Sequence, residues 1–162
     1  MRAVFAILIV SSVAHADDGL HASAPAKASS PHLVYVEALG KGGLYGVGYE
    51  RALLPWLAIG GAGSWSALRG QHVTTLSPYA HATVLGRGHH AMFGELGAIV
   101  ARSSIGSPVM DWDGLTTWGG GGFATLGYEH ASRHVVLRAS AGVAVGRGGA
   151  QPMVGFAIGA RP

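Results

Sequence analysis

The sequence predicts an all-β fold, an eight-stranded antiparallel β-barrel that crosses a membrane. Three observations lead to this prediction. Segments of about ten residues recur between turn-forming residues, close to the length of a tilted membrane-crossing strand. Apolar residues alternate within these segments with small or charged ones. Finally, 49% of the residues are hydrophobic and only 12% are charged, which is little charge for a surface that faces water.

The N-terminal part of the chain is expected to lie outside the barrel. Residues 1–16 are typical of a secretory signal peptide, with Arg2 before the apolar run "AVFAILIV" and the cleavage signal "AHA" at the end. A short membrane anchor, the alternative, would have a different length and different flanks. Residues 17–31 are small, polar and proline-bearing, which predicts a disordered lead-in. The barrel domain is then expected over residues 32–162.

Eight strands are expected after the lead-in, and their connections alternate between short turns and longer loops. The longest connection is 102–119. In outer-membrane barrels the longer loops face outward, and the short turns face the periplasm together with both termini. We therefore expect the turns 86–90 and 130–133 on the periplasmic side. The expected strands are 32–40, 43–51, 56–66, 74–85, 90–101, 120–130, 133–143 and 152–161.

The alternation also predicts which face of each strand points inward. In "YGVGYE" (45–50) large apolar residues alternate with glycines and Glu50. A water-soluble barrel would place the bulky apolar residues inside and the charges outside. A narrow eight-stranded barrel has room inside for the smaller face, so we expect the apolar face to meet lipid. Leu137, near the middle of the strand 133–143, should then face lipid, while its neighbour Arg138 points inward.

Several charged residues fall on faces predicted to point inward. Because an unpaired charge in such an interior is costly, we expect ion pairs, with Arg138 held by Glu129 or Glu37. Tyrosine, histidine and hydroxyl side chains should complete the hydrogen bonds. We interpret this set as a plug that fills the barrel; a gated path for ions or protons is the alternative. The predicted interior polar residues are Glu37, Glu50, Glu95, Glu129, Arg138, Arg161, Tyr79 and His81.

The stretch "VYVEALGKGGLYGVGYERALLPWLAIGGAG" (34–63) resembles the opening hairpins of small bacterial outer-membrane β-barrel proteins of the OmpA/OmpX-like kind. "GRGHHAMFGELGAIV" (86–100) and "GFATLGYEHASRHVVLRASAGVAVG" (122–146) resemble later hairpins of the same family. The resemblance implies a monomer in the cell outer membrane, with membrane lipid and the barrel-assembly machinery as partners and no cofactor. Such barrels usually end in an aromatic residue, whereas the last aromatic residue here is Phe156.

One motif is similar to that of an enzyme. His130-Ala131-Ser132 resembles the His-x-Ser of outer-membrane lipid A deacylases, in which a downstream acid completes a serine triad. No aspartate or glutamate follows Glu129, so the group that would orient the histidine is missing. We therefore expect no catalytic residues.

Two further patterns concern binding. His89-His90, with His72 and His81, lack the spacing of a formed metal site, so no metal is expected. The sequence "DWDG" lacks the further ligands of a calcium loop and is more typical of a loop tip. The candidate contacts of the long loop with a partner or with lipid headgroups are Asp111, Trp112, Asp113 and Trp118.

These observations predict an integral outer-membrane barrel with a filled interior and a non-enzymatic structural or surface-interaction role. A secreted or periplasmic soluble β-barrel that binds an apolar ligand is one alternative, and a lipid-modifying outer-membrane enzyme is another. Nucleic-acid binding is not expected, because the net charge is only +3 and the basic residues do not cluster.

Overall fold

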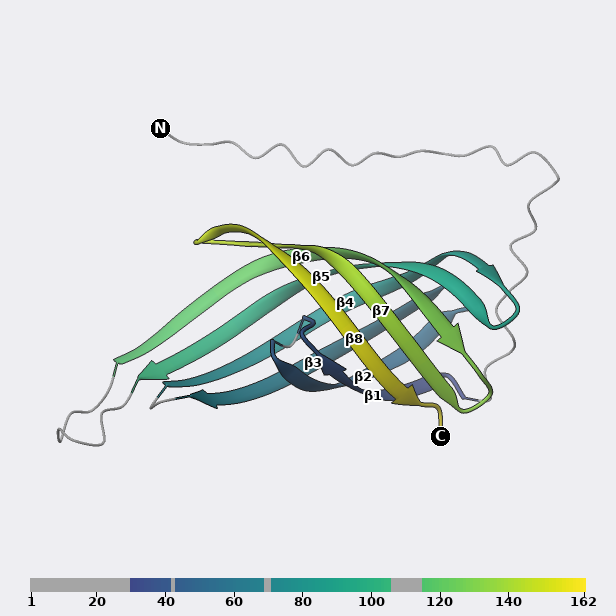
Figure 1. Cartoon of the computed structure of the whole chain (residues 1–162), viewed down its shortest axis with the longest axis horizontal. Helices are drawn as coiled ribbons and strands as arrows, with labels where there is room; N and C mark the ends of the chain where they lie inside the picture. The colour runs from purple at the N-terminus through teal and green to yellow at the C-terminus, as the bar shows by residue number, and fades with distance from the viewer. Residues whose placement is uncertain (1–29, 42, 69–70, 106–114) are drawn as a thin grey trace.

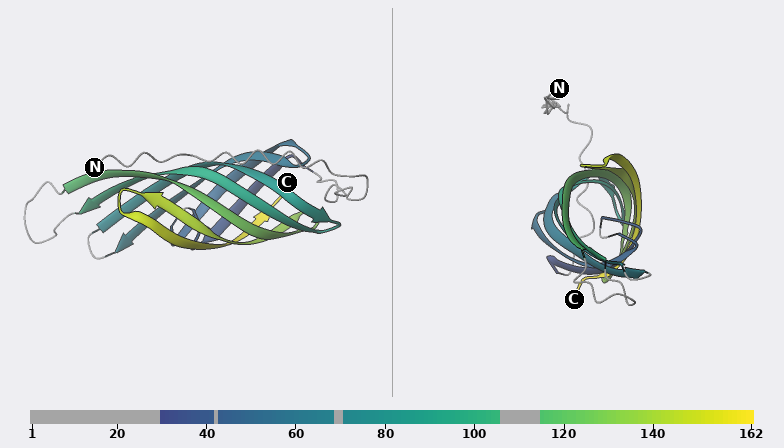
Figure 2. Two further views of the ribbon diagram at one scale, coloured as in Figure 1. Left: turned by 90° about the horizontal axis from the view of Figure 1, so that it is seen from above. Right: turned by 90° about the vertical axis from the view of Figure 1, so that its left-hand side faces the viewer.

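The chain forms a closed antiparallel β-barrel, as the computed structural model shows for residues 30–41, 43–68, 71–105 and 115–162 (Figure 1). Each strand pairs with its neighbours in sequence, and β1 pairs with β8 to close the barrel (Figure 2). This confirms the fold class predicted from the sequence. The strands are β1 (His32–Ala38), β2 (Tyr45–Leu54), β3 (Leu57–Leu68), β4 (Gln71–Arg87), β5 (His90–Ile105), β6 (Leu115–Ala131), β7 (Val135–Gly146) and β8 (Gly149–Ala160).

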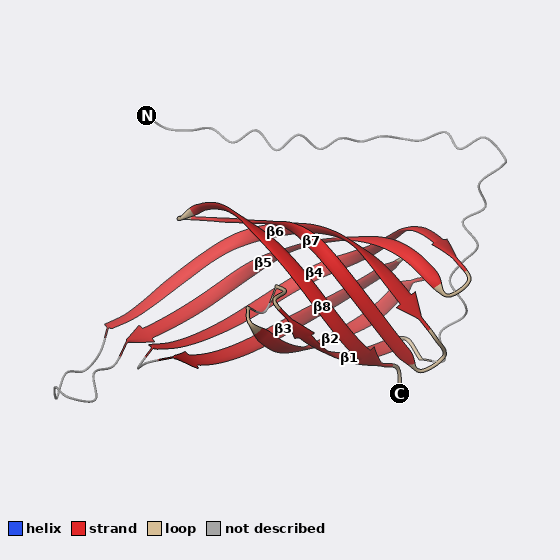
Figure 3. Ribbon diagram, in the orientation of Figure 1, coloured by secondary structure: helices blue, strands red, loops and turns tan. Residues whose placement is uncertain are grey.

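Strands make up the regular structure throughout, as the colouring of Figure 3 shows. The part of the chain that the structure describes holds no helix long and apolar enough to cross a membrane. The predicted signal peptide and nearly all of the predicted lead-in fall in residues 1–29, which lie outside the described residues.

The predicted long loop 102–119 is shorter in the structure, because strand structure reaches into it from both sides. β5 continues to Ile105 and β6 begins at Leu115, and these two residues are cross-strand partners. The expected strands stopped at 101 and resumed at 120, because "RSSI" (102–105) and "LTTWG" (115–119) show no regular alternation of apolar and polar residues. In the structure these two segments pair with each other from Ala101–Gly119 to Ile105–Leu115, so backbone pairing extends both strands beyond what the local pattern predicts.

The barrel wall has unequal heights. β1 has 7 residues, whereas β4 and β6 have 17 each. β3, β4, β5 and β6 continue beyond the last paired residues of β2–β3 and β6–β7. There they form an open sheet, which projects from one end of the barrel (Figure 1). We call this sheet the extension; it consists of residues 64–68, 71–76, 100–105 and 115–120. It lies at the end opposite to the β2–β3, β4–β5 and β6–β7 turns.

Successive residues of each strand alternate between the interior and the outer surface, as the pattern predicted. In β5, Glu95 is 4% exposed and its neighbour Leu96 is 68% exposed. The inner faces are not purely small, because Tyr35 and Phe93 are buried there beside the glutamates. The outer surface carries most of the large apolar side chains, which gives the barrel an apolar belt.

Glycines on the inner face make room for the large rings. A Cβ at Gly48 would lie 2.1 Å from the ring of Tyr35, and one at Gly127 would lie 2.4 Å from the ring of Phe93. Both separations are far below van der Waals contact, so a side chain and a ring cannot share either place. The interior of this narrow barrel therefore depends on pairs of one aromatic residue and one glycine on an adjacent strand.

Candidate functional site

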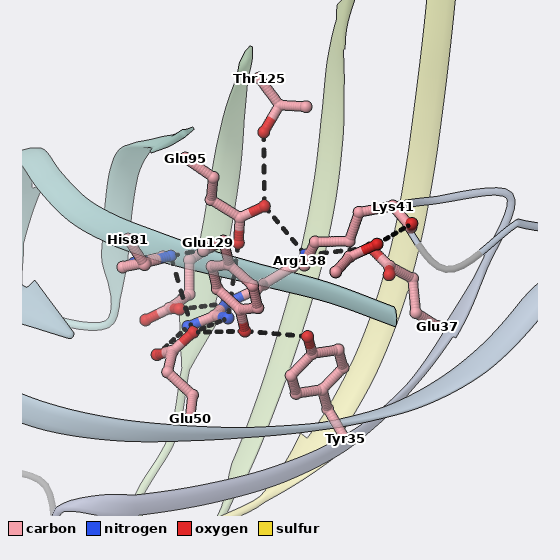
Figure 4. Close-up of polar contacts among 11 residues, drawn as sticks. Tyr35, Glu37, Lys41, Glu50, His81, Glu95, Thr125, Glu129 and Arg138 are labelled. Atoms are coloured by element: carbon pink, nitrogen blue, oxygen red, sulfur yellow. Dashed lines mark hydrogen bonds and ion pairs between the residues drawn. The ribbon is translucent and has the colours of Figure 1, made fainter. Parts of the chain in front are cut away.

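A network of buried charged residues fills the middle of the barrel, and Arg138 of β7 lies at its centre (Figure 4). Its Nε donates to Glu129 Oε2 at 2.6 Å, and Glu129 is its cross-strand partner on β6. Its Nη1 and Nη2 donate to the two oxygens of Glu50 at 2.7 and 3.0 Å. Glu50 belongs to β2, so this paired contact connects strands that are not adjacent in the wall. Two-point contacts of this kind are the strongest and most directional form of ion pair.

Lys41 supplies a second buried cation. It lies in the connection between β1 and β2, and it is only 5% exposed. Its Nζ lies 3.2 Å from Glu37 Oε1 and 2.9 Å from Glu95 Oε2, and 4.5 Å from the centre of the Tyr79 ring. The Ser77 hydroxyl donates to the Lys41 carbonyl at 2.7 Å, which fixes the connection inside the barrel.

Sequence reasoning missed Lys41, because "GKGG" was interpreted as a simple turn between two strands. The sequence did contain a signal for a third cation. The predicted interior held four glutamates but only two arginines, and a buried carboxylate needs a partner. The structure also changes one predicted pair: Glu37 contacts Lys41, while Arg138 contacts Glu129 and Glu50.

Neutral side chains join the ion pairs into one network. Tyr79 donates to Glu50 Oε2 at 3.1 Å, so its oxygen is left to accept the hydrogen bond from Tyr35 at 2.8 Å. Thr125 donates to Glu95 Oε2 at 3.3 Å. His81 lies with Nδ1 3.4 Å from Glu95 Oε1, and its ring stacks on Phe93.

The last predicted interior residue, Arg161, lies just beyond β8 at the rim of the barrel. Its Nη2 is 3.6 Å from Glu129 Oε1, so Glu129 contacts two arginines. The structure thus brings all eight predicted interior polar residues into one connected set, together with Lys41 and Thr125.

The interior is closely packed around this network. Between Tyr35, Phe93 and Arg138, the remaining space does not admit a water molecule. An eight-stranded barrel has an interior that side chains can fill completely. At this level of the barrel the described side chains form a plug.

Three buried side chains of the network, Glu50, His81 and Glu95, have atoms within 4.8 Å of one another, a spacing that metal ligands can have. Both carboxylates already accept hydrogen bonds from Arg138 or Lys41. A metal ion here would have to displace a buried cation, so we assign no metal to this group.

The His130-Ala131-Ser132 motif does not form a catalytic pair. The Ser132 hydroxyl donates to the Val135 carbonyl at 3.1 Å and accepts from the Val135 amide at 3.2 Å. These bonds close the turn between β6 and β7, as serine commonly does in turns. The His130 ring instead contacts His90, with the two Nδ1 atoms 3.5 Å apart.

Of the four candidate loop contacts, three lie outside the described residues: Asp111, Trp112 and Asp113. Trp118 belongs to the extension, where its side chain is exposed. The Arg102 guanidinium lies 5.9 Å from the centre of its ring, a cation–π distance.

Comparison with known proteins gives similarity of structure only. No protein-family model and no curated protein matches the sequence. The N-terminal β-barrel domain of Pseudomonas aeruginosa OprF superposes with a TM-score of 0.58 at 17% identity, over 81% of this chain and 97% of that domain. Ail, the attachment invasion locus protein of Yersinia pestis, gives 0.52 at 11% identity, over 80% and 94%. The chain therefore has the fold of small outer-membrane barrels.

Proposed function

We propose that the protein is an integral outer-membrane barrel, monomeric and sealed, with a structural or surface-interaction role and no enzymatic activity. The observation that carries the proposal is the combination of a closed barrel with an apolar outer belt. In lipid every backbone N–H and C=O must find a partner within the protein, which closure provides. The export that this location requires is the predicted role of residues 1–16.

The interior supports a plug more than a transport path. Arg138 and Lys41 connect strands across the barrel through short ion pairs, and the space beside them is too small for water. The soluble alternative, a barrel that binds an apolar ligand, would need an apolar interior cavity. Here the charges lie inside and the apolar side chains outside, so this alternative has less support.

The absence of an orienting acid after Glu129, and the engagement of Ser132 in a turn, support a non-enzymatic role. The surface most suited to contact with a partner is the extension, since it projects beyond the wall and exposes Trp65 and Trp118. We infer that it faces the cell exterior, because longer loops do so in this class of barrel.

The membrane location and orientation are tested by labelling single cysteines in whole cells, which is unambiguous because the chain has no native cysteine. Thr116→Cys in the extension should react with a membrane-impermeant maleimide, whereas Ser132→Cys in the β6–β7 turn should react only after the outer membrane is opened. Labelling of Ser132→Cys alone would reverse the orientation. Recovery of the protein in the soluble periplasmic fraction would refute the membrane location.

The sealed interior is tested in planar lipid bilayers. We expect the purified protein to give no stable porin-sized current, because the plug leaves no water path at its level. Stable large single-channel currents would contradict the plug. The detergent used for purification, added alone, is the control.

A further inference from the structure

Two histidines, His90 and His130, meet on the outer surface where the β4–β5 and β6–β7 turns lie side by side. His90 opens β5 and His130 lies near the end of β6, and the two are direct cross-strand partners. Both side chains point to the outer surface, on the same side of the sheet as the exposed Tyr128, which lies two residues before His130 in β6. Their ring centres are 4.9 Å apart, and their Nδ1 atoms are 3.5 Å apart.

This separation suits two nitrogen ligands of one metal ion. Zinc binds imidazole nitrogen at about 2.0–2.1 Å, so two such ligands at a tetrahedral angle lie about 3.4 Å apart. The Nδ1 atoms of His90 and His130 are already at 3.5 Å. The two nitrogen atoms therefore have the separation of two zinc ligands, and a zinc ion would take the place of the Tyr128 hydroxyl at His90 Nδ1.

His89 lies near this pair but does not complete a group of three closely spaced ligand atoms; among the described residues only Glu50, His81 and Glu95 form such a group. The His89 ring centre lies 6.1 Å from that of His130. Its Nδ1 is 2.9 Å from the Ala131 carbonyl oxygen, and since a carbonyl can only accept, Nδ1 carries the proton. The Nε2 atom then has the free lone pair. A carbonyl partner of this kind is what commonly orients a zinc-binding histidine.

The barrel contains an internal control for this arrangement. His32 and Tyr49 form a stacked pair at the same end of the barrel, with ring centres 5.9 Å apart and Nδ1 2.6 Å from the hydroxyl. His90 and Tyr128 repeat this pair, also with ring centres 5.9 Å apart and a contact from Nδ1 to the hydroxyl. A histidine–tyrosine pair is thus an ordinary feature of this rim. The additional imidazoles are found around His90.

We propose that His90 and His130 bind a Zn²⁺ ion on the outer surface of the barrel. The ion would join the β4–β5 hairpin to the β6–β7 hairpin. The sequence did not suggest this site, because the histidines considered as possible metal ligands were His72, His81, His89 and His90, without His130. The register of β5 and β6 pairs His90 with His130 instead.

Titration calorimetry with Zn²⁺ on the purified full chain, folded in detergent, tests the site. We expect His90→Gln and His130→Gln each to weaken binding by about tenfold or more. The double variant should show little further loss, because either single change already breaks the pair. The matched control is His32→Gln, which removes the equivalent histidine at Tyr49 and should change the affinity less than about twofold. Tyr128→Phe should retain binding, since the hydroxyl only competes for His90 Nδ1.

Zinc should also stabilise the fold, which gives a second readout. At a free Zn²⁺ concentration 100 times Kd, the folding equilibrium should shift about 100-fold toward the folded state. The shift should persist in His32→Gln and fall to about tenfold or less in His90→Gln at the same Zn²⁺ concentration. If the double variant binds Zn²⁺ as tightly as the parent, or if zinc leaves the urea midpoint of the parent unchanged, the proposal is wrong.

Discussion

Thr125 and Leu126 are consecutive residues of β6, but their surroundings have little in common. Thr125 is 5% exposed and donates a hydrogen bond to Glu95. Leu126 is 67% exposed on the outer surface. The inner face depends on particular partners, since each buried charge needs an opposite charge and each large ring needs a glycine. The outer face, which we propose meets lipid, needs only to be apolar, because lipid adapts to any apolar shape. This difference predicts how substitutions on the two faces should behave.

The largest effect is expected at Arg138, on the inner face. Arg138→Leu removes the paired contact with Glu50 and leaves that carboxylate buried without its strongest partner. Breaking a buried ion pair costs about 3–5 kcal/mol of the free energy of unfolding. Urea unfolding in lipid vesicles measures this value.

The double variant Arg138→Leu/Glu50→Gln should recover part of the lost free energy of unfolding, because the unpaired Glu50 carboxylate is replaced by a neutral amide. The double variant Arg138→Leu/Glu129→Gln should recover less stability, since Glu129 still contacts Arg161 when Arg138 is removed. Equal rescue by both would mean that Glu50 is not the principal partner of Arg138.

On the outer face, a cation should be tolerated according to its depth in the membrane. Leu126 pairs with Ala141 near the middle of β7, whereas Leu137 is the third residue of that strand. The sequence had placed Leu137 near the middle, because it set the start of the strand at 133. Leu126→Arg should therefore cost about 2–4 kcal/mol in lipid, and Leu137→Arg only about 0–1 kcal/mol.

Unfolding titrations in vesicles compare the two variants, with Leu126→Ile as the matched apolar control. The control should fall within about 0.5 kcal/mol of the parent. A Leu126→Arg variant as stable as the parent would mean that this face does not meet lipid.

The smallest effect concerns the glycines of the two faces. A side chain at Gly127 would clash with Phe93 and with the Ala139 carbonyl, so Gly127→Ala should cost about 1–3 kcal/mol. A Cβ at Gly94, on the outer face, would approach Leu126 no closer than 3.5 Å, which is ordinary contact. Gly94→Ala should be neutral or stabilising by about 0.5 kcal/mol. Urea midpoints of the two variants show the contrast, and equal losses would mean that the inner face is not tightly packed.

The sequence by itself determined the strand number, the face of each strand and the charged interior. These features follow from an alternation of period two, which is local: Leu126 and Glu129 carry the signal wherever the strand lies. Gly46 and Gly48, which alternate with Tyr45 and Tyr49 along one strand, likewise predict a narrow interior. The length of the extension was less predictable, because residues 102–105 and 115–119 show no regular alternation and form strand by pairing with each other.

Only the tertiary structure decided which charges meet. Arg138 and Glu50 are 88 residues apart in sequence and come from β7 and β2, so their contact depends on barrel closure and on the register of every strand between them. Lys41 is buried because β1 ends at Ala38 and β2 begins only at Tyr45, so the connection between them lies in the interior of the barrel. His90 and His130 become partners for the same reason, since register is a property of two strands and the sequence pattern describes one strand at a time.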